Sequence, residues 1–397
     1  MKLQVGILST SAKVGSTRRL REVLTARGHE APVLRPKDLR ILVQDDQPVL
    51  LYKGQRLARP DAVIPRIGTS KTFFGTALVQ QFEQMGVFTL NSAQAIAASR
   101  NKLRAIQQLS RHGIGLPETV FLSSRADVVS AVECVGGVPV IIKLLEGTQG
   151  IGVMLAESQE GATAILETLR KTGQDVLVQR FVAESRGRDV RVLVVGGRVV
   201  AAVRRVAQGA EFRSNVHRGS KALPIVDLDP AYAETARKAA QILGLAVAGV
   251  DILEGRDGPL LVEVNSSPSI AGMEEVTGLD LASPIVDYLE RNVHLRPLDV
   301  AQRVTVRRGY GVAEVPVTEG SPLTGQTLGQ IGLGDRGLRT VCVLRDGDAV
   351  IDQDDGLQLR EGDRLVLFGL LSSVRDLLPT HGPDRRPGGS EGVPPGA

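Results

Sequence analysis

The chain has 397 residues, of which 42% are hydrophobic and 23% are charged, and this composition excludes a protein that is disordered throughout. At about 150 residues per domain, the length predicts two or three domains. No segment reaches the roughly 18–20 apolar residues of a membrane span, and no signal-peptide core precedes the first strand pattern. Two distant cysteines, Cys134 and Cys342, argue against disulfides and cysteine-bound metal, and predict a cytoplasmic protein without a membrane partner.

Charge and aromatic content argue against direct binding of nucleic acid. The net charge is +4, and no dense run of Lys and Arg resembles a nucleic-acid arm. Aromatic residues make up only 3% of the chain and tryptophan is absent, so platforms on which bases could stack are not expected.

Residues 1–95 are predicted to form a small α/β domain. The first helix is expected to be capped by Ser16 and to end at Gly28. Gly6 and Gly15 lack the G-x-G-x-x-G spacing of a dinucleotide fold, which argues against a nicotinamide cofactor. The expected elements are a strand at 3–8, a helix at 16–28, a strand at 61–67 and a helix at 77–85.

Residues 96–292 carry strands, helices and hairpins that predict mixed α+β layers. Gly196 and Gly197 are expected to form a tight hairpin turn, and Asp229 followed by Pro230 is a helix-start signal. The expected helices are 101–112, 158–171 and 230–243, and the expected strands are 138–145, 153–156, 176–179, 189–195, 198–204, 247–253 and 259–265.

The remainder of the chain is predicted to hold a third, smaller domain. Residues 293–304 are expected to be a linker, and residues 305–379 form a unit rich in valine and glycine. Residues 380–397 are rich in Pro, Gly and Arg and are expected to be a disordered tail. The expected strands of the small domain are 312–317, 340–344 and 364–368.

A glycine-rich loop and a lysine in an apolar strand suggest phosphate binding. The loop 146–152 lies between two strands, where its backbone N–H groups can fold over phosphates, although a flexible turn is an equally good interpretation of the loop alone. Lys143 stands in the apolar strand before it. A buried lysine needs a partner, which a phosphate supplies, whereas the plainer interpretation places it on an exposed face.

Two carboxylates and an amide suggest a magnesium site. Glu263 and Asn265 are two residues apart on one strand, so their side chains point to the same face. Asp251 ends another apolar strand. Oxygen ligands of this kind suit magnesium, which is usually shared with substrate phosphates. Taken singly, Glu263 fits an ordinary exposed strand position and Asp251 fits a turn.

A basic segment, 213–219, follows Arg204 and Arg205. Arginines bind carboxylates and phosphates bidentately, although a solvated basic loop is the favoured interpretation of the segment taken by itself. No nucleophile elbow and no Cys/His pair is visible in the sequence.

In this order the segments resemble the ATP-grasp superfamily, and more closely the RimK family of ATP-dependent α-L-glutamate ligases. The resemblance covers residues 1–292 and implies an ATP-grasp fold preceded by a pre-ATP-grasp α/β domain, with ATP held between two α+β subdomains. The matching strings are 61–69, 145–153, 212–219, 247–253 and 262–268.

The resemblance also implies roles for individual residues. Arg213 and Asn215 match catalytic positions, and one or two magnesium or manganese ions are expected on Asp251, Glu263 and Asn265. Two departures are present: Gln179-Arg180 replaces the usual Gln-Glu of the hinge, and the family's Ala-Ser-Pro-Gly after the metal asparagine is here Ser266-Ser-Pro-Ser. The residues that match nucleotide contacts are Lys102, Lys143, Gly147, Gln149, Gly150, Gly152, Arg180, Phe181, Asp189, Arg213, Ser214 and Asn215.

The implied activity is an ATP- and magnesium-dependent ligase that modifies proteins or peptides. A carboxylate is activated as an acyl phosphate, and the amine of L-glutamate attacks it to form an amide. The implied acceptor is an acidic C-terminus, either of a small-subunit ribosomal protein or of a growing glutamate chain. Arg204, Arg213 and Arg218 are candidates to hold the carboxylates.

Residues 305–379 resemble the TrkA-C module, also called RCK-C, of potassium-uptake regulators. The likeness implies a small α/β domain that senses a ligand or dimerises, and hence a homo-oligomer. Two alternatives remain: an ATP-grasp ligase acting on a small-molecule carboxylate, and a non-catalytic nucleotide-binding regulator of ion transport. The regulator is disfavoured because such proteins pair this module with a Rossmann domain, and no dinucleotide fingerprint occurs here.

Overall fold

A computed structural model describes most of the chain and divides it into two compact units, Met1–Arg296 and Pro297–Ala397. Among the described residues, no helix is both long and apolar enough to cross a membrane. The domain boundaries predicted from the sequence remain predictions, and the tail 380–397 lies outside the described residues. The described residues are 2–44, 47–68, 72–122, 128–145, 152–171, 173–208, 220–294, 309–318, 321–346, 348–350, 353–375 and 377.

The first unit begins with a parallel sheet in the strand order β2-β1-β6-β7. All five residues of β1 are buried, as expected for a central parallel strand covered on both faces. A separate antiparallel sheet, β3-β4-β5, adjoins it. The elements are β1 (Val5–Ser9), α1 (Gly15–Ala26), β2 (Val33–Leu34), η1 (Pro36–Asp38), β3 (Leu39–Gln44), β4 (Gln47–Tyr52), β5 (Gln55–Arg56), β6 (Ala62–Arg66), α2 (Thr72–Gln84), β7 (Phe88–Thr89) and α3 (Ala93–Arg100).

A second, antiparallel sheet has the strand order β10-β9-β11-β8. Alternation along β9 sends Val140 and Ile142 into a core shared with α5 and α6, so Ile141 and Lys143 point to the opposite face. The elements are α4 (Lys102–Ser110), β8 (Thr119–Leu122), α5 (Val128–Cys134), β9 (Val140–Leu144), β10 (Val153–Ala156), α6 (Gln159–Lys171), β11 (Val176–Arg180) and η3 (Ala183–Ser185).

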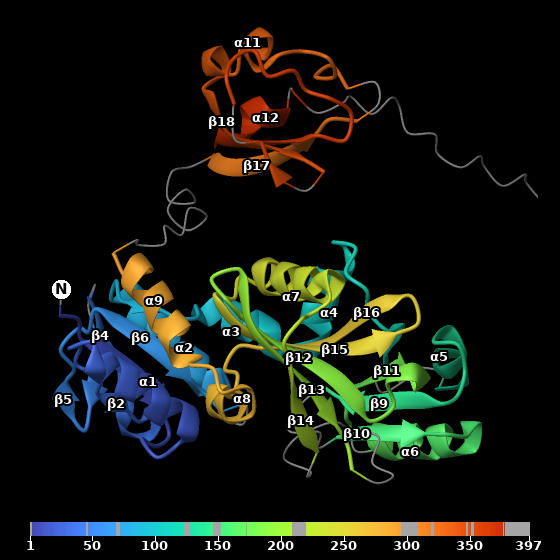
Figure 1. Ribbon diagram of the computed structural model, residues 1–397. Coiled ribbons are helices and arrows are strands. Elements are labelled where there is room, and N and C mark those ends of the chain that lie inside the picture. Colours follow the sequence, from blue (N-terminus) through green and yellow to red (C-terminus); the bar gives the residue numbers. More distant parts are fainter. Residues whose placement is uncertain are drawn as a thin grey trace, which may run out of the picture. The chain divides into compact units, whose positions relative to one another are not determined.

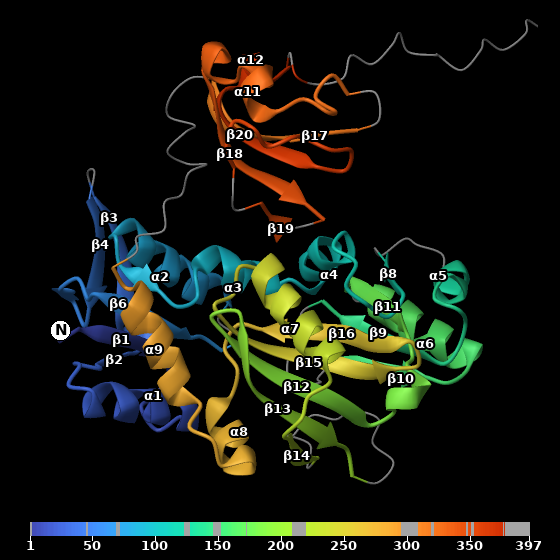
Figure 2. The same ribbon diagram turned by 45° about the horizontal axis from the view of Figure 1, so that its top comes forward.

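A five-stranded antiparallel sheet, β14-β13-β12-β15-β16, forms the centre of the unit. Figures 1 and 2 show the parallel sheet and the β8–β11 sheet on opposite sides of it. The predicted hairpin is confirmed: Gly196 and Gly197 have φ of 57° and 75°, a region that favours glycine. The elements are β12 (Arg188–Val195), β13 (Arg198–Val206), β14 (Lys221–Ile225), α7 (Pro230–Ile242), β15 (Val247–Gly255), β16 (Gly258–Asn265), α8 (Ile270–Thr277) and α9 (Ala282–Asn292).

The two faces of the central sheet have different coverings. One face packs against α7, whose Ala236, Ala239 and Ala240 are buried in a common core with the strands. On the other face, the apolar half that includes Leu193 and Val195 packs against α8, α9 and the first strand of the chain. The remaining half of that face carries charged side chains, and it lies near the β8–β11 sheet, because the charge of Glu263 acts on Lys143 of β9.

The second unit is a four-stranded sheet in the order β17-β20-β18-β19 with short helices. Its three longer strands agree with the predicted strands 312–317, 340–344 and 364–368. Thr327 and Gln330 form a capping box that starts α11. The elements are β17 (Tyr310–Pro316), α11 (Leu328–Ile331), η5 (Gly334–Arg336), β18 (Leu338–Arg345), β19 (Asp348–Ala349), β20 (Arg364–Leu370) and α12 (Leu371–Arg375).

One predicted cap is wrong, and several elements were not predicted. Helix α1 begins at Gly15 without a side-chain cap. The Ser16 hydroxyl instead accepts a hydrogen bond from the Ile270 N–H at 3.1 Å, so a distant segment outcompetes the local cap. By contrast, Asp229 caps α7 as predicted, accepting from Ala231 N–H at 2.8 Å. The elements that the sequence pattern missed include β3, β4, β5, α3, α8 and α9.

Candidate active site

Charged side chains from four adjacent strands meet on the uncovered half of the central sheet. Asp189 on β12 lies opposite Arg205 on β13, and Arg191 on β12 lies opposite Asp251 on β15. Asp251 in turn lies opposite Glu263 on β16. Directly paired residues share a face, so the register alone gathers these five side chains.

Two arginines hold Asp251 and Asp189 in place. Arg191 Nε and Nη2 donate to the two Asp251 oxygens at 2.6 and 2.5 Å, and Arg205 Nη2 lies 3.0 Å from Asp251 Oδ2. Arg205 also forms a bidentate pair with Asp189. Burial opposes ionisation of Asp251, but the charges of Arg191 and Arg205 outweigh it and lower the pKa of the carboxyl. The pKa of Arg205 is raised by Asp251 and Asp189 despite its burial.

The three predicted metal ligands share one face of the β15–β16 pair. Asp251 lies opposite Glu263, and Asn265 lies two residues further along β16. The Nδ2 atom of Asn265 is buried without a hydrogen-bond partner. Where the structure is described, no group of three or more His, Cys, Asp and Glu side chains could hold a metal. Two carboxylates and one amide oxygen therefore fit magnesium only if phosphates and water complete its shell, which is its usual mode of binding.

Lys102 and Lys143 approach the same region from the second sheet. Lys102 Nζ donates to the Leu144 carbonyl at 2.8 Å, and Lys143 Nζ donates to Gln179 Oε1 at 2.6 Å. Burial lowers the pKa of Lys143 to about 8, and the charge of Glu263 partly offsets it. The pKa of Lys102 is lowered by burial, again against the charge of Glu263. The two lysines and Glu263 therefore act on one another across the space between the sheets.

Gln179 on β11 links Lys143 on β9 to Thr119 on β8 across one sheet, a role that the sequence did not suggest. Gln179 is 5% exposed, and its Nε2 donates to Thr119 Oγ1 at 2.8 Å. Its amide orientation is thereby fixed, with the oxygen facing the lysine. The sequence feature that could have indicated this role is a polar residue, Gln179, directly after the apolar residues 176–178 of β11.

The predicted hinge residues, Arg180 and Phe181, lie at the end of β11 and directly after it. Arg180 forms an ion pair with Glu118, and its backbone N–H donates to the Glu118 carbonyl at 2.9 Å. The Arg186 guanidinium stands over the Phe181 ring, 5.8 Å from its centre. With its side chain engaged by Glu118, Arg180 fits the predicted nucleotide contact through backbone atoms, and the contact itself stays a prediction for Arg180 and Phe181.

The end of the glycine-rich loop joins β9 and β10. Gly152 has φ of +82°, and a Cβ atom there would lie 2.9 Å from Leu144 Cδ1. Its carbonyl accepts from Leu144 N–H at 2.9 Å. Both the backbone conformation and the close approach require glycine at this position. The predicted site residues Gly147, Gln149, Gly150, Arg213, Ser214 and Asn215, and with them Arg218, lie outside the described residues.

Arg204 does not belong to this site. It lies opposite Val190, so it points to the α7 face of the central sheet, where its Nη2 donates to Glu254 at 2.7 Å. The expectation that Arg204 holds a substrate carboxylate is wrong, because the strand alternation sends it away from Asp251. Its neighbour Arg205 faces the site instead.

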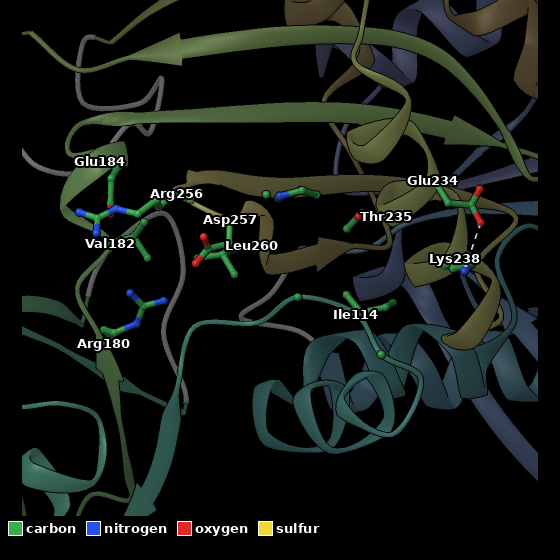
Figure 3. Close-up of a pocket in the computed structure, with 15 residues that line it drawn as sticks. Ile114, Arg180, Val182, Glu184, Glu234, Thr235, Lys238, Arg256, Asp257 and Leu260 are labelled. Atoms are coloured by element: carbon green, nitrogen blue, oxygen red, sulfur yellow. Dashed lines mark ion pairs between the residues drawn. The ribbon is translucent and has the colours of Figure 1, made fainter.

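A cavity of about 440 Å³ lies away from the charged face. It is lined by the hinge, α7 and the turn between β15 and β16, including Arg180, Thr235 and Arg256. Figure 3 shows Arg180, Val182 and Arg256 near one end and the Glu234–Lys238 ion pair at the other. Lys143, Asp251 and Glu263 are not among its lining residues, so the candidate site is the surface between two sheets rather than this cavity.

Comparison with known proteins covers both units of the chain. Residues 99–289 match the RimK-like ATP-grasp domain, residues 3–96 the RimK PreATP-grasp domain and residues 312–381 the TrkA-C domain. The chain is 51% identical over 377 residues to a "Probable alpha-L-glutamate ligase" from Rhodopirellula baltica, which covers 95% of this chain and 93% of the relative. A protein of the same name from a Picosynechococcus strain is 50% identical and covers 73% of this chain and 96% of its own.

Solved structures share the fold of the first unit. The RimK domain protein ATP-grasp from Sphaerobacter thermophilus is 26% identical, with a TM-score of 0.55 over 72% of this chain and 99% of that one. The ATP-grasp ligase PsnB, solved with a minimal precursor, is 23% identical, with a TM-score of 0.58 over 73% of this chain and 99% of its own.

Proposed function

Because this chain belongs to the RimK-like ATP-grasp family of alpha-L-glutamate ligases, with a pre-ATP-grasp domain before the catalytic domain and a TrkA-C domain after it, we propose that it joins L-glutamate to the C-terminal carboxylate of a protein or peptide. The observation that carries the proposal is the pair of opposed charged surfaces, with Lys102 and Lys143 on one side and Asp251 and Glu263 on the other. The family uses ATP, and the proposed acceptor is a small-subunit ribosomal protein or a growing glutamate chain.

The chemistry needs charge neutralisation more than a nucleophilic side chain. An oxygen of the acceptor carboxylate attacks the γ-phosphorus of ATP, the bond to the β-phosphate oxygen breaks, and an acyl phosphate and ADP result. The glutamate amine then attacks the acyl carbon, loses a proton, and inorganic phosphate leaves as the amide forms. Negative charge is concentrated on phosphoryl oxygens throughout, so fixed cations lower the barrier.

The residues on the two sheets supply this environment. Lys102 and Lys143 lie where they can hold phosphate oxygens, and Gln179 fixes the position of the Lys143 ammonium. Asp251, Glu263 and Asn265 would hold magnesium, which supplies Lewis-acid polarisation of the transferred phosphoryl group. Arg191 and Arg205 keep Asp251 ionised and oriented, and Arg205 does the same for Asp189.

Mass spectrometry of candidate acceptors tests the proposal directly. The protein is incubated with ATP, magnesium, L-glutamate and either a peptide ending in glutamate or a small-molecule carboxylate. Stepwise addition of glutamyl residues to the peptide supports the proposal. Product only from the small molecule would favour the small-molecule ligase, and ATP binding without glutamate-dependent turnover would favour the non-catalytic regulator.

The lowered pKa of Lys143 predicts a pH-dependent affinity for nucleotide. Phosphates favour the protonated lysine, which predominates below about pH 8. Affinity for AMP-PNP with magnesium is therefore expected to be level below pH 8 and to fall above it, by at most about tenfold per pH unit. Isothermal titration between pH 6.5 and 9.5 measures this. A Lys143→Arg variant stays charged throughout, and an equally steep fall in that variant would assign the titration to another group.

A further inference from the structure

Two arginines beside the candidate site lack the carboxylate partner that other partly buried arginines have. Arg191, Arg205 and Arg345 each form a bidentate pair with an aspartate. Arg66 and Arg100 form no ion pair with any described residue, although both are only partly exposed. A partly buried cation without a neighbouring anion destabilises the folded protein, so an anionic ligand would stabilise this pair.

Most of the N–H groups of the two guanidinium groups are uncommitted. Arg66 makes one hydrogen bond, from Nη2 to the Pro268 carbonyl at 2.8 Å, and its Nε is buried without a partner. Arg100 makes two, to the Ile67 carbonyl at 2.5 Å and to Thr72 Oγ1 at 3.2 Å. Each guanidinium has five N–H donors, so the neutral contacts orient the groups without neutralising them.

The electrostatics agree with this description. Burial, together with the charge of Arg100, lowers the pKa of Arg66 to about 10. Burial also lowers the pKa of Arg100, and the charge of Glu263 partly offsets this. Both groups remain protonated at neutral pH. They repel each other in a position where an anion would relieve both.

The pair lies between the predicted metal site and the parallel sheet. Arg66 is the last residue of β6, at the carboxyl end of a parallel strand, where α/β sheets bind their ligands. Its partner Pro268 follows Asn265 by three residues, and Ser267 Oγ donates to the Pro65 carbonyl at 3.4 Å. Arg100 ends α3, two residues before Lys102. The two arginines thus stand beside the metal ligands on one side and the phosphate-binding lysine on the other.

A small void beside Arg66 limits what can bind there. The void, about 10 Å³, is lined mainly by apolar side chains together with Arg66 and Ser266, and it holds at most one water molecule. The void is therefore too small for a carboxylate, and the charge of Glu263 acting on Arg100 indicates that the pair also faces the candidate site.

We propose that Arg66 and Arg100 form a subsite for a carboxylate of a glutamyl substrate that does not itself react. The inference rests on the proposed function and deepens it. The carboxylate that becomes an acyl phosphate must remain nucleophilic, and tight pairing with two fixed arginines would suppress that. The remaining carboxylates belong either to the incoming glutamate or to the side chain of the terminal acceptor glutamate. Bidentate arginine contacts suit either of them.

Steady-state kinetics of Arg66→Gln and Arg100→Gln test the subsite in the full-length protein. The KM for one glutamyl substrate is expected to rise about 10- to 100-fold, while the affinity for AMP-PNP changes less than about twofold. A rise for free L-glutamate assigns the subsite to the incoming amino acid, and a rise for the peptide assigns it to the acceptor. Arg204→Gln, on the opposite face, is the matched control and should change neither value.

Analogues show whether charge is what the arginines recognise. The wild-type protein is expected to prefer glutamate over glutamine or γ-aminobutyrate, each of which lacks one carboxylate, and the Gln variants are expected to lose one of these preferences. Arg66→Lys and Arg100→Lys should restore part of it, which a purely structural role would not explain. Unchanged preferences and an unchanged KM in folded variants would overturn the proposal.

A binding measurement separates this inference from the proposed function. If the wild-type protein forms no glutamyl product, the proposed function fails, and the subsite is judged by titration with glutarate in the presence of AMP-PNP and magnesium. Glutarate binding that the Arg66→Gln variant loses supports the subsite. Equal binding by both proteins, or none by either, contradicts it.

Discussion

Replacing Asp251 with asparagine is expected to destroy activity and to destabilise the fold at once. The substitution removes a predicted metal ligand, and it also leaves Arg191 and Arg205 short of the anion that each contacts. Removing one partner of a buried ion pair lowers the free energy of unfolding by about 3–5 kcal/mol. Loss of magnesium-based charge neutralisation is expected to lower kcat/KM by about 10³-fold. Chemical denaturation and steady-state kinetics measure the two effects.

Glu263→Gln is the matched comparison for Asp251→Asn. Glu263 is exposed, so its replacement should change the free energy of unfolding by less than about 0.5 kcal/mol. It should nevertheless lower kcat/KM about as strongly, because it removes the second carboxylate of the predicted metal site. Equal destabilisation by both substitutions, or normal turnover by Glu263→Gln, would contradict the division of roles between the two carboxylates.

Replacing Lys143 with methionine is expected to stabilise the protein while abolishing its activity. The pKa of this lysine falls from 10.5 to about 8 in the folded state, so its charge opposes folding. At neutral pH methionine should raise the free energy of unfolding by about 1–3 kcal/mol, after allowance for the lost hydrogen bond to Gln179. Loss of this cation, which is predicted to bind phosphate, should lower kcat/KM by at least about 10²-fold.

The pH dependence gives this prediction a clear sign. The penalty for a lysine with a lowered pKa is fully present below about pH 8 and disappears as the pH rises towards 10.5, where the unfolded lysine also loses its proton. The stability gain of Lys143→Met should therefore shrink over that interval in denaturation experiments. Lys238→Met, on an exposed lysine of α7 that pairs with Glu234, is the control and should show no such gain. A destabilised Lys143→Met protein would show that the lysine is structural.

Both predictions describe a site whose charges are arranged for a ligand rather than for the stability of the protein alone. Lys143 and Arg66 have lowered pKa values, and neither has a carboxylate partner among the described residues. Asp251, by contrast, forms ion pairs with Arg191 and Arg205 within the protein. The unpaired cations cluster where polyanionic phosphates and acidic substrates would bind, which is a common pattern at functional sites.

The sequence was sufficient for the elements with strong local signals. Asp229-Pro230 fixed the start of α7, and the two glycines at 196–197 fixed a hairpin, because cap and turn chemistry acts within a few residues. The period-two pattern of Glu263 and Asn265 correctly placed both on one face. The motif strings and their order identified the family, because the occurrence of several short motifs together in one order is highly specific.

What depended on strand register could not be read from the chain. Nothing in the local sequence distinguishes Arg204 from Arg205. Arg204 lies opposite Val190 and points to the α7 face of the sheet, whereas Arg205 lies opposite Asp189 and points to the candidate site. Ser16 is a residue type that commonly caps helices. Its hydroxyl instead accepts a hydrogen bond from the N–H of Ile270, 254 residues away in the chain. The structure therefore decided which polar groups are partners.

By itself, the sequence determined the family and the order of the domains, and it predicted which residues bind metal and phosphate, because these inferences depend on residue type and short spacing. Only the tertiary structure showed that Arg66 and Arg100 stand together without a carboxylate, and that Arg191 and Arg205 engage Asp251. The physical reason is that the cost of a buried charge depends on which groups surround it. That environment is created by strands and helices that are far apart in the chain.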